Sequence, residues 1–230
     1  MNKKLSSLIC IVLIIIISVP IISIAFAGKP DKGPIEKKVF IHRIKPDNPG
    51  KPPKPDGRGK EWYKYSGIHW ASTNLPVTYI VDTELDYGII ETSFETWDDE
   101  ISTVLLFEGV QGEVTAGIID GINALSYGDY PDAGVIAVTY ILYYSYTGEI
   151  IEVDTLFDTD YIWGDATGNP DVMDLQNIAT HEFGHWLVLD DLYNRPARQQ
   201  TMYGYGTYGE IIKRTLESGD IAGIQKIYGE

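Results

Sequence analysis

The sequence predicts an α+β fold, in which helices pack against a mixed, twisted β-sheet. One observation is a series of β-branched and aromatic runs bounded by proline or glycine, which is typical of strands. Another is the recurrence of apolar residues at three- and four-residue steps, which is typical of amphipathic helices. The expected order of strand, helix, several strands, helix and helix favours helices packed against one sheet. A chain of 230 residues is long enough for one such domain with appendages.

The first elements of the expected domain are one strand and one helix. Val77 to Val81 follows Pro76 and combines β-branched and aromatic residues, as strands do. The next apolar residues have helical spacing and predict one face of an amphipathic helix: Ile90, Phe94, Trp97, Ile101, Val104 and Leu105.

Strands and two further helices are expected in the rest of the domain. Glycine-bounded β-branched runs predict strands at 114–119, 135–144 and 150–156. Thr147-Gly148 lies between the last two runs and predicts a hairpin. A second helix should extend from about Asp171 to about Leu189, and a third should occupy Ser218 to Tyr228.

Charge is unevenly distributed along the chain, whose formal net charge is −15. Residues 1–27 carry two Lys and no acidic residue, residues 28–60 carry ten Lys or Arg against four Asp or Glu, and residues 61–230 carry six against 29. A body this acidic repels phosphate backbones, so we expect no nucleic-acid partner. The single cysteine, Cys10, excludes a disulfide framework and a cysteine-built metal site in the body.

Residues 1–27 have the pattern of a secretory signal peptide. A basic start is followed by an apolar stretch that Pro20 interrupts and that ends in Ala25-Phe26-Ala27. We therefore expect cleavage after Ala27 and a secreted, extracellular protein. The apolar stretch, of roughly 20 residues, is also long enough to span a bilayer, so an uncleaved N-terminal membrane tether facing outward is the alternative.

Residues 28–60 are rich in proline and lysine, and their one aliphatic run is Val39 to Ile44. Such a composition cannot bury a core, so we expect an extended, mobile segment. Two roles are open for it: a spacer, or a pro-segment whose positive charge lies across the acidic body and blocks its cleft. The spacer is favoured, because charge alone does not fix a docking site.

The second predicted helix contains the sequence His181-Glu182-Phe183-Gly184-His185. Residues four apart on a helix point the same way, so both imidazoles can bind one zinc ion while Glu182 holds a water beside them. The apolar residues of this helix cluster roughly opposite the histidines: Val172, Leu175, Ala179, Phe183 and Trp186. A catalytic zinc usually takes three protein ligands, and no histidine follows His185, so the third ligand should be another side chain.

These residues resemble the signature of a known clan of peptidases. His181 to Asp191 is similar to the extended metzincin motif, H-E-x-x-H-x-x-G-x-x-[HD], and His-Glu-Phe-Gly-His is the form common in matrixins. Thr201-Met202-Tyr203-Gly204 resembles the Met-turn beneath the zinc in that clan, and Ser218 to Gly229 resembles the matrixin C-terminal helix. The resemblance covers about Trp62 to Tyr228 and is strongest from His181 onward.

The resemblance implies a metzincin-like mixed twisted sheet with an active-site helix, a long packing helix and a C-terminal helix. It also implies that residues 61–230 form a monomeric zinc endopeptidase domain acting on proteins or peptides. Zinc would be held by His181, His185 and Asp191, with Glu182 as the general base and Met202 at the Met-turn. The strand at Gly134 to Thr139 resembles the family's cleft-edge strand and should align an extended peptide antiparallel to itself.

One departure leaves the third ligand open. Val188 replaces the glycine at which the family's chain turns sharply, and a β-branched residue is unfavourable in a left-handed conformation. Either the turn differs, or Asp191 reaches the zinc by another path. A gluzincin-like peptidase with Glu210 or Glu217 as the third ligand is therefore an alternative. A non-catalytic, metal-stabilised surface binding module is another, although Glu182 speaks against it because a structural site needs no general base.

Further departures concern other metal sites and latency. Val138 and Leu156 replace histidines of the family's second zinc site, so we expect no such site. Asp158 matches a family calcium ligand, which makes it the candidate for a Ca²⁺ site. The family's cysteine switch is missing, and Asp56 and His42 could replace it at the zinc. We expect Asp56 to be a turn residue and His42 to be an incidental polar residue instead.

Overall fold

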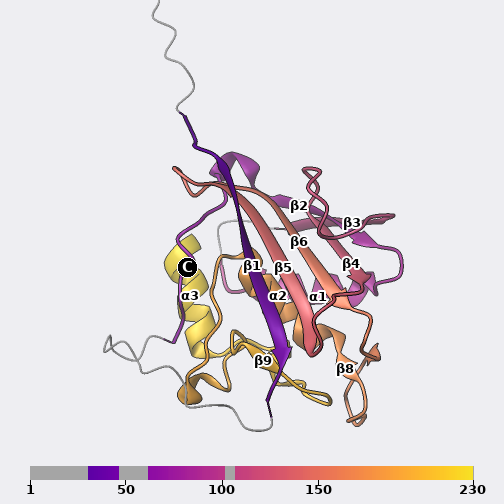
Figure 1. The fold of residues 1–230 in the computed structure, drawn as a ribbon. Coiled ribbons are helices and arrows are strands. Elements are labelled where there is room, and N and C mark those ends of the chain that lie inside the picture. The colour runs from indigo at the N-terminus through magenta and orange to yellow at the C-terminus, as the bar shows by residue number, and fades with distance from the viewer. Residues whose placement is uncertain (1–30, 47–61, 102–106, 230) are drawn as a thin grey trace, which may run out of the picture. The chain divides into compact units, whose positions relative to one another are not determined.

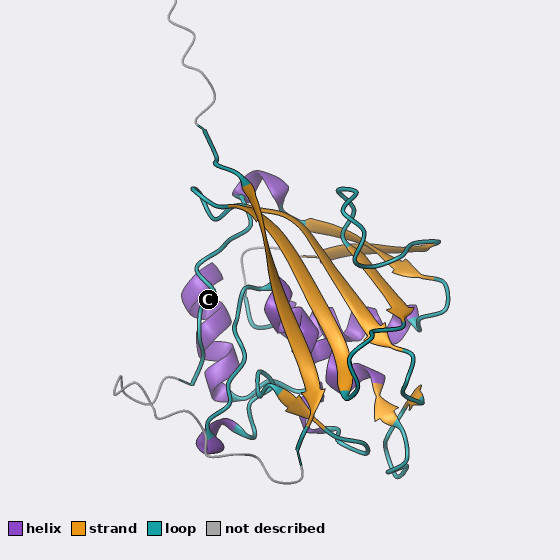
Figure 2. Cartoon of the chain, viewed as in Figure 1, coloured by secondary structure: helices purple, strands orange, loops and turns teal. Residues whose placement is uncertain are grey.

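A seven-stranded mixed sheet organises the fold (Figures 1 and 2). The computed structural model describes residues 31–46, 62–101 and 107–229, nearly all within the unit Lys32–Glu230. The strands, in spatial order, are β3 (Phe107–Gly112), β2 (Val77–Asp82), β4 (Ala124–Gly128), β6 (Ile150–Asp158), β5 (Val135–Tyr144), β1 (Ile35–Ile44) and β9 (Tyr205–Gly206). A separate parallel pair consists of β7 (Trp163–Gly164) and β8 (Met173–Asp174).

The sheet is parallel on one side and antiparallel around β5. Strand β2 pairs in parallel with β3 and β4, and β4 pairs in parallel with β6. Strand β5 is antiparallel to both of its neighbours, β6 and β1, and the short strand β9 continues the sheet in parallel to β1. This mixed sheet with helices confirms the predicted fold class.

In the described part of the chain, three helices accompany the sheet: α1 (Tyr87–Asp98), α2 (Leu175–Trp186) and α3 (Ser218–Tyr228). Short 3-10 turns occur at η1 (Ser72–Asn74), η2 (Arg195–Ala197) and η3 (Ile212–Arg214). Helices α1 and α2 pack together through aromatic rings, with Phe94 stacked on Phe183 and edge-on to Trp186. These rings belong to the hydrophobic core, so α2 is anchored on its apolar side, as the sequence predicted. None of the helices in the described ranges is long and apolar enough to cross a membrane.

Several boundaries differ from the sequence-based expectations. Helix α1 ends at Asp98, and the predicted helical positions Val104 and Leu105 lie outside the described residues. Helix α2 begins at Leu175, not near Asp171, because Asp174 caps it by accepting a hydrogen bond from the backbone N–H of Asn177 at 2.8 Å. Helix α3 has the predicted bounds.

The strand predicted at 114–119 is wrong, since this stretch is a loop between β3 and β4. Side chains accept two of its backbone N–H groups: Ser126 Oγ binds the N–H of Ala116 at 2.9 Å, and Asp154 Oδ2 binds that of Gly117 at 2.7 Å. Backbone groups satisfied in this way are not available for a strand ladder. The strands in this part of the chain, β3 and β4, come before and after the predicted one in the sequence.

Residues 35–44 form strand β1, which pairs with β5 from Ile35 opposite Tyr144 to Arg43 opposite Val135. Phe40 is 6% exposed and His42 is 1% exposed, so the expectation that this segment cannot contribute to a core is wrong for these residues. Its basic residues meet acidic ones of the body: Lys38 lies 2.8 Å from Asp190, and Arg43 lies 3.3 Å from Asp132. The composition of 28–60 could not reveal this, because the matching edge and charges belong to distant residues.

Candidate metal centre

Helix α2 is held in place by hydrogen bonds and by the segment beneath it. The indole N–H of Trp97 donates to the Thr180 carbonyl, and that of Trp70 donates to the Trp186 carbonyl, both at 2.8 Å. Gly184 faces Met202, and a Cβ at this position would collide with Met202 Sδ. Met202 therefore packs directly under the helix that carries both candidate histidine ligands, where the resemblance placed a Met-turn.

Three candidate ligand atoms lie close together beside α2. Asp191 Oδ1 lies 3.2 Å from His181 Nε2 and 3.6 Å from His185 Nε2. All three atoms are buried, and none has a hydrogen-bond partner among the residues that the structure describes. Ligand atoms at the usual zinc distances in a tetrahedral site would lie roughly 3.3 Å apart, so this arrangement fits a zinc ion. Partnerless buried polar atoms are costly in an empty site, which favours a metal among them.

The opposite atoms of these three side chains are hydrogen-bonded. His181 Nδ1 donates to the Thr201 carbonyl at 2.6 Å, and His185 Nδ1 donates to the Leu189 carbonyl at 2.8 Å. The Tyr193 hydroxyl donates to Asp191 Oδ2 at 3.0 Å. Such partners fix each ligand with its free atom toward the metal position. Tyr193 was not predicted, because a tyrosine two residues after a ligand has no distinctive sequence signal.

Burial and neighbouring charges set the charge states of these groups. It lowers the pKa of His181, and it lowers that of His185 to about 4, so both imidazoles are neutral near pH 7. Burial acts to raise the pKa of Asp191, but the neighbouring His185 and His181 bring it down to about 2. Neutral histidines and an ionised carboxylate are the forms that bind metal.

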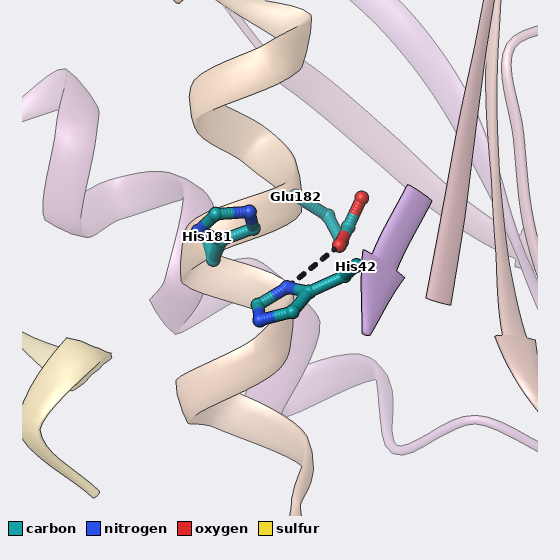
Figure 3. Close-up of side chains that lie close together, drawn as sticks. All are labelled: His42, His181 and Glu182. Atoms are coloured by element: carbon teal, nitrogen blue, oxygen red, sulfur yellow. Dashed lines mark hydrogen bonds and ion pairs between the residues drawn. The ribbon is translucent and has the colours of Figure 1, made fainter. Parts of the chain in front are cut away.

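Glu182 lies beside this group with both carboxylate oxygens engaged. Oε2 accepts a hydrogen bond from the Thr139 hydroxyl of β5 at 2.7 Å. Oε1 lies 3.1 Å from His42 Nδ1. Figure 3 shows the His42 side chain pointing toward the Glu182 carboxylate. Burial raises the pKa of Glu182 to about 8, and the bond from Thr139 acts against this rise. A carboxyl group with a raised pKa suits a general base that works near neutral pH.

Strand β1 covers the candidate centre with two side chains. The Phe40 ring stacks on His185 with centroids 3.9 Å apart and planes at 8°. The His42 ring lies 3.9 Å from His181, and its Nε2 lies 3.0 Å from Lys213 Nζ. The expectation that His42 is an incidental polar residue is therefore wrong. Lys213 carried no sequence signal, since nothing marks a single lysine between Ile212 and Arg214 as buried.

Val188 takes the left-handed conformation that the family's glycine would take, with φ of 67°. The sharp turn is preserved: the backbone N–H of Val188 donates to the His185 carbonyl, and that of Leu189 donates to the Gly184 carbonyl, both at 2.9 Å. This turn brings Asp191 back to the histidines.

Glu210 and Glu217, the rival third ligands, have other partners. Glu210 lies at hydrogen-bond distance from the Asn177 amide, 3.5 Å, and Glu217 forms the capping box of α3. Among the described residues, the carboxylate that lies with both histidines is that of Asp191.

An alanine variant is usually more stable than a glycine variant, and the strain at Val188 predicts that this order of stability is reversed there. We expect Val188→Gly to be more stable than Val188→Ala by about 1 kcal/mol, because alanine in a left-handed conformation is strained. Val153, equally buried within β6, is the control: there alanine should be more stable than glycine by about 0.5–1 kcal/mol. Urea unfolding of the four variants measures both differences, and the same order at both positions would contradict the strain.

Three aspartates form a second group that could hold a cation: Asp129, Asp158 and Asp160. Asp158 is buried, and burial raises its pKa. Its Oδ1 accepts the backbone N–H of Asp160 at 2.9 Å, while its Oδ2 is buried and has no hydrogen-bond partner within the described ranges. An unsatisfied carboxylate oxygen beside two other carboxylates is suited to Ca²⁺.

Comparison with known proteins gives the family. A model of the matrixin family matches residues 61–229. The chain belongs to the matrixin family. The matrixin resemblance inferred from the sequence is thus confirmed at the level of the family, and the family is one of zinc-dependent metalloproteases.

Among curated matrixins, the chain is similar to matrix metalloproteinase-16 from Homo sapiens, with 31% identity over 61% of this chain and 23% of the relative. Matrix metalloproteinase-25 from Homo sapiens is 26% identical over 75% of this chain and 30% of the relative. Macrophage metalloelastase from Oryctolagus cuniculus is 31% identical over 64% of this chain and 29% of the relative. The chain therefore spans less than a third of the length of these relatives.

Proposed function

We propose that this matrixin is a secreted zinc endopeptidase that hydrolyses peptide bonds of extracellular proteins. One observation carries the proposal: three buried ligand atoms of His181, His185 and Asp191 lie together, with no hydrogen-bond partner among the described residues, next to the buried carboxyl group of Glu182. A binding module that kept a metal for stability would not need this carboxyl group. Secretion rests on the signal pattern of residues 1–27, which lie outside the described residues.

The chemistry that zinc supplies in such a site is polarisation of the scissile carbonyl and acidification of a water molecule. Glu182 would take a proton from that water while the water oxygen attacks the carbonyl carbon. Glu182 would then return a proton to the leaving amine as the C–N bond breaks. Thr139 orients Glu182 by donating to its Oε2. Strand β5 would align the substrate through main-chain hydrogen bonds.

We further propose that residues 35–44 are a blocking pro-segment and not a spacer. Strand β1 already takes the antiparallel place on β5 that a substrate would need, and His42 occupies Oε1 of the general base. A peptide cannot pair with β5 until β1 leaves. This latency would use no cysteine, and its alternative candidate, Asp56, lies outside the described residues.

Glu182→Gln tests the peptidase. In the chain opened by Phe40→Ser and His42→Ser, we expect Glu182→Gln to lower the cleavage of casein by at least about a hundredfold, because the general base is lost, while zinc content stays unchanged. Glu210→Gln removes a carboxylate farther along the chain and is the control that should retain activity. Both variants carry Phe40→Ser and His42→Ser, because the cleft of the unaltered chain should be blocked by β1. If the chain with Phe40→Ser and His42→Ser and with Glu182 intact binds zinc but cleaves no casein, the result would favour the non-catalytic binding module.

We also propose that Asp158 binds Ca²⁺ together with Asp129 and Asp160. The partnerless Oδ2 of Asp158 supports this. Millimolar Ca²⁺ should raise the melting temperature of the wild type, since a ligand bound by the folded state stabilises it. Asp158→Asn should lose this increase and Asp132→Asn, in the neighbouring loop, should keep it. An equal increase in both variants would place the ion elsewhere.

A further inference from the structure

Lys213 forms the end of the buried space that the His42 side chain enters. Its side chain is fully buried, and its backbone N–H is tied to Asn177 Oδ1 of α2 at 2.7 Å. Lys213 Nζ lies 2.6 Å from the Tyr203 carbonyl, 2.9 Å from the Tyr205 carbonyl and 3.0 Å from His42 Nε2. An ammonium group has three N–H donors, so two bind the backbone and the third points to the side chain inserted from β1.

The partners of His42 define what this space accepts. The ammonium group of Lys213 only donates hydrogen bonds, so His42 Nε2 accepts there and Nδ1 carries the proton that it donates to Glu182. An inserted side chain therefore meets a donor at its far end. If that end carries no acceptor, a buried, charged N–H is left without a partner, which is unfavourable.

A peptide that replaced β1 on β5 in the same register would place one side chain where His42 lies. We propose that Lys213 is a specificity-determining residue that selects glutamate or glutamine at this position of the substrate. This inference rests on the proposed peptidase function. His42 Nε2 is four bonds from its Cα, and so are the Oε atoms of glutamate and glutamine. Leucine has no acceptor, and lysine or arginine would place a like charge against Lys213.

The acidic body imposes a different preference on the flanking residues. Residues 61–230 carry 29 acidic against six basic side chains, and β1 meets them with Lys38 on Asp190 and Arg43 on Asp132. The substrate class that fits is thus a basic peptide with one glutamate or glutamine in the Lys213 space. Glu182 lies on the other side of this space and repels a carboxylate, so glutamine should be accepted as well as glutamate.

The inference can be tested within the full chain by replacing His42 with Glu, Gln, Leu or Lys. Hydrogen–deuterium exchange of residues 35–44 measures how firmly β1 stays on β5, in EDTA so that no self-cleavage occurs. We expect His42→Glu and His42→Gln to keep β1 protected, and His42→Leu and His42→Lys to exchange about ten- to a hundredfold faster. In a Lys213→Glu background, His42→Lys should protect β1 better than His42→Glu does, which is the reverse of the order expected with Lys213 present. Melting temperatures verify that each variant folds.

Equal protection of β1 in all four His42 variants would overturn the inference. This test leaves Lys213 itself unchanged. An order that Lys213→Glu leaves unchanged would also overturn it. Cleavage of a peptide library by the Phe40→Ser, His42→Ser chain gives a separate measurement. If the peptidase function fails, no peptide is cut although the exchange order holds. If Lys213 does not select the substrate side chain at the position of His42, peptides are cut without a preference for glutamate or glutamine there.

Discussion

Opening the cleft should increase the peptidase activity of the full chain about ten- to a hundredfold. Phe40→Ser and His42→Ser together remove a buried ring stacked on His185 and the contact with Glu182. The lost ring burial and stacking alone are worth about 2–4 kcal/mol, which is enough to shift β1 from mostly bound to often released. The rate of hydrolysis of a fluorogenic peptide measures the change.

Ile35→Ser and Val39→Ser are matched controls on the same strand. Their side chains are 58% and 40% exposed, so neither substitution should release β1. Added salt should also increase the rate of hydrolysis, because it screens the exposed ion pair of Arg43 with Asp132 that helps to hold β1 in place. If the double substitution leaves the rate unchanged while the protein remains folded, residues 35–44 do not block the cleft.

Loss of the Asp191 carboxylate should remove tight zinc binding. We expect Asp191→Ala to weaken zinc affinity by more than about a hundredfold and Tyr193→Phe to weaken it by about ten- to a hundredfold, because Tyr193 only orients the carboxylate. Competition with a chelator measures affinity, and the zinc-dependent rise in melting temperature gives a second readout without catalysis. A cavity of about 340 Å³ lies beside this carboxylate and is lined by Phe40, Asp191 and Tyr193, among others.

The rival ligands serve as controls in the same experiment. Glu210→Ala and Glu217→Ala should bind zinc like the wild type, because Glu210 lies near Asn177 and Glu217 caps α3. A large loss of zinc in either of them, with Asp191→Ala unaffected, would favour the gluzincin-like arrangement.

Elements with a strong local signal could be predicted from the sequence. Helix α3 and strand β5 have the predicted bounds, and α2 carries its apolar residues on the side that packs against α1. The two histidines and Glu182 could be placed together because helical spacing alone brings them to one turn. The loop at 114–119 could not, because the side chains that hold its backbone come from Ser126 and Asp154.

The residues that sequence reasoning missed at the site all act through tertiary contacts. His42 and Lys213 are 171 positions apart in the chain and meet beside Glu182, and neither has a neighbour that marks it. The same holds for Thr139, whose hydroxyl orients Glu182 from β5. The expectation that Val188 would change the turn or the path of Asp191 is wrong. The turn forms with Val188 in the left-handed conformation, because the hydrogen bonds around it and its own burial outweigh the strain.

The pairing of β1 with β5 has a consequence for solubility. Strand β5 runs for ten residues, Val135–Tyr144, without a single charge, and β1 covers one whole side of it. If β1 departs, a long, apolar strand edge is left open, which is the feature that promotes association between chains. The segment that would silence the peptidase would thus also protect its sheet, and light scattering should detect self-association of the opened protein whenever substrate is scarce.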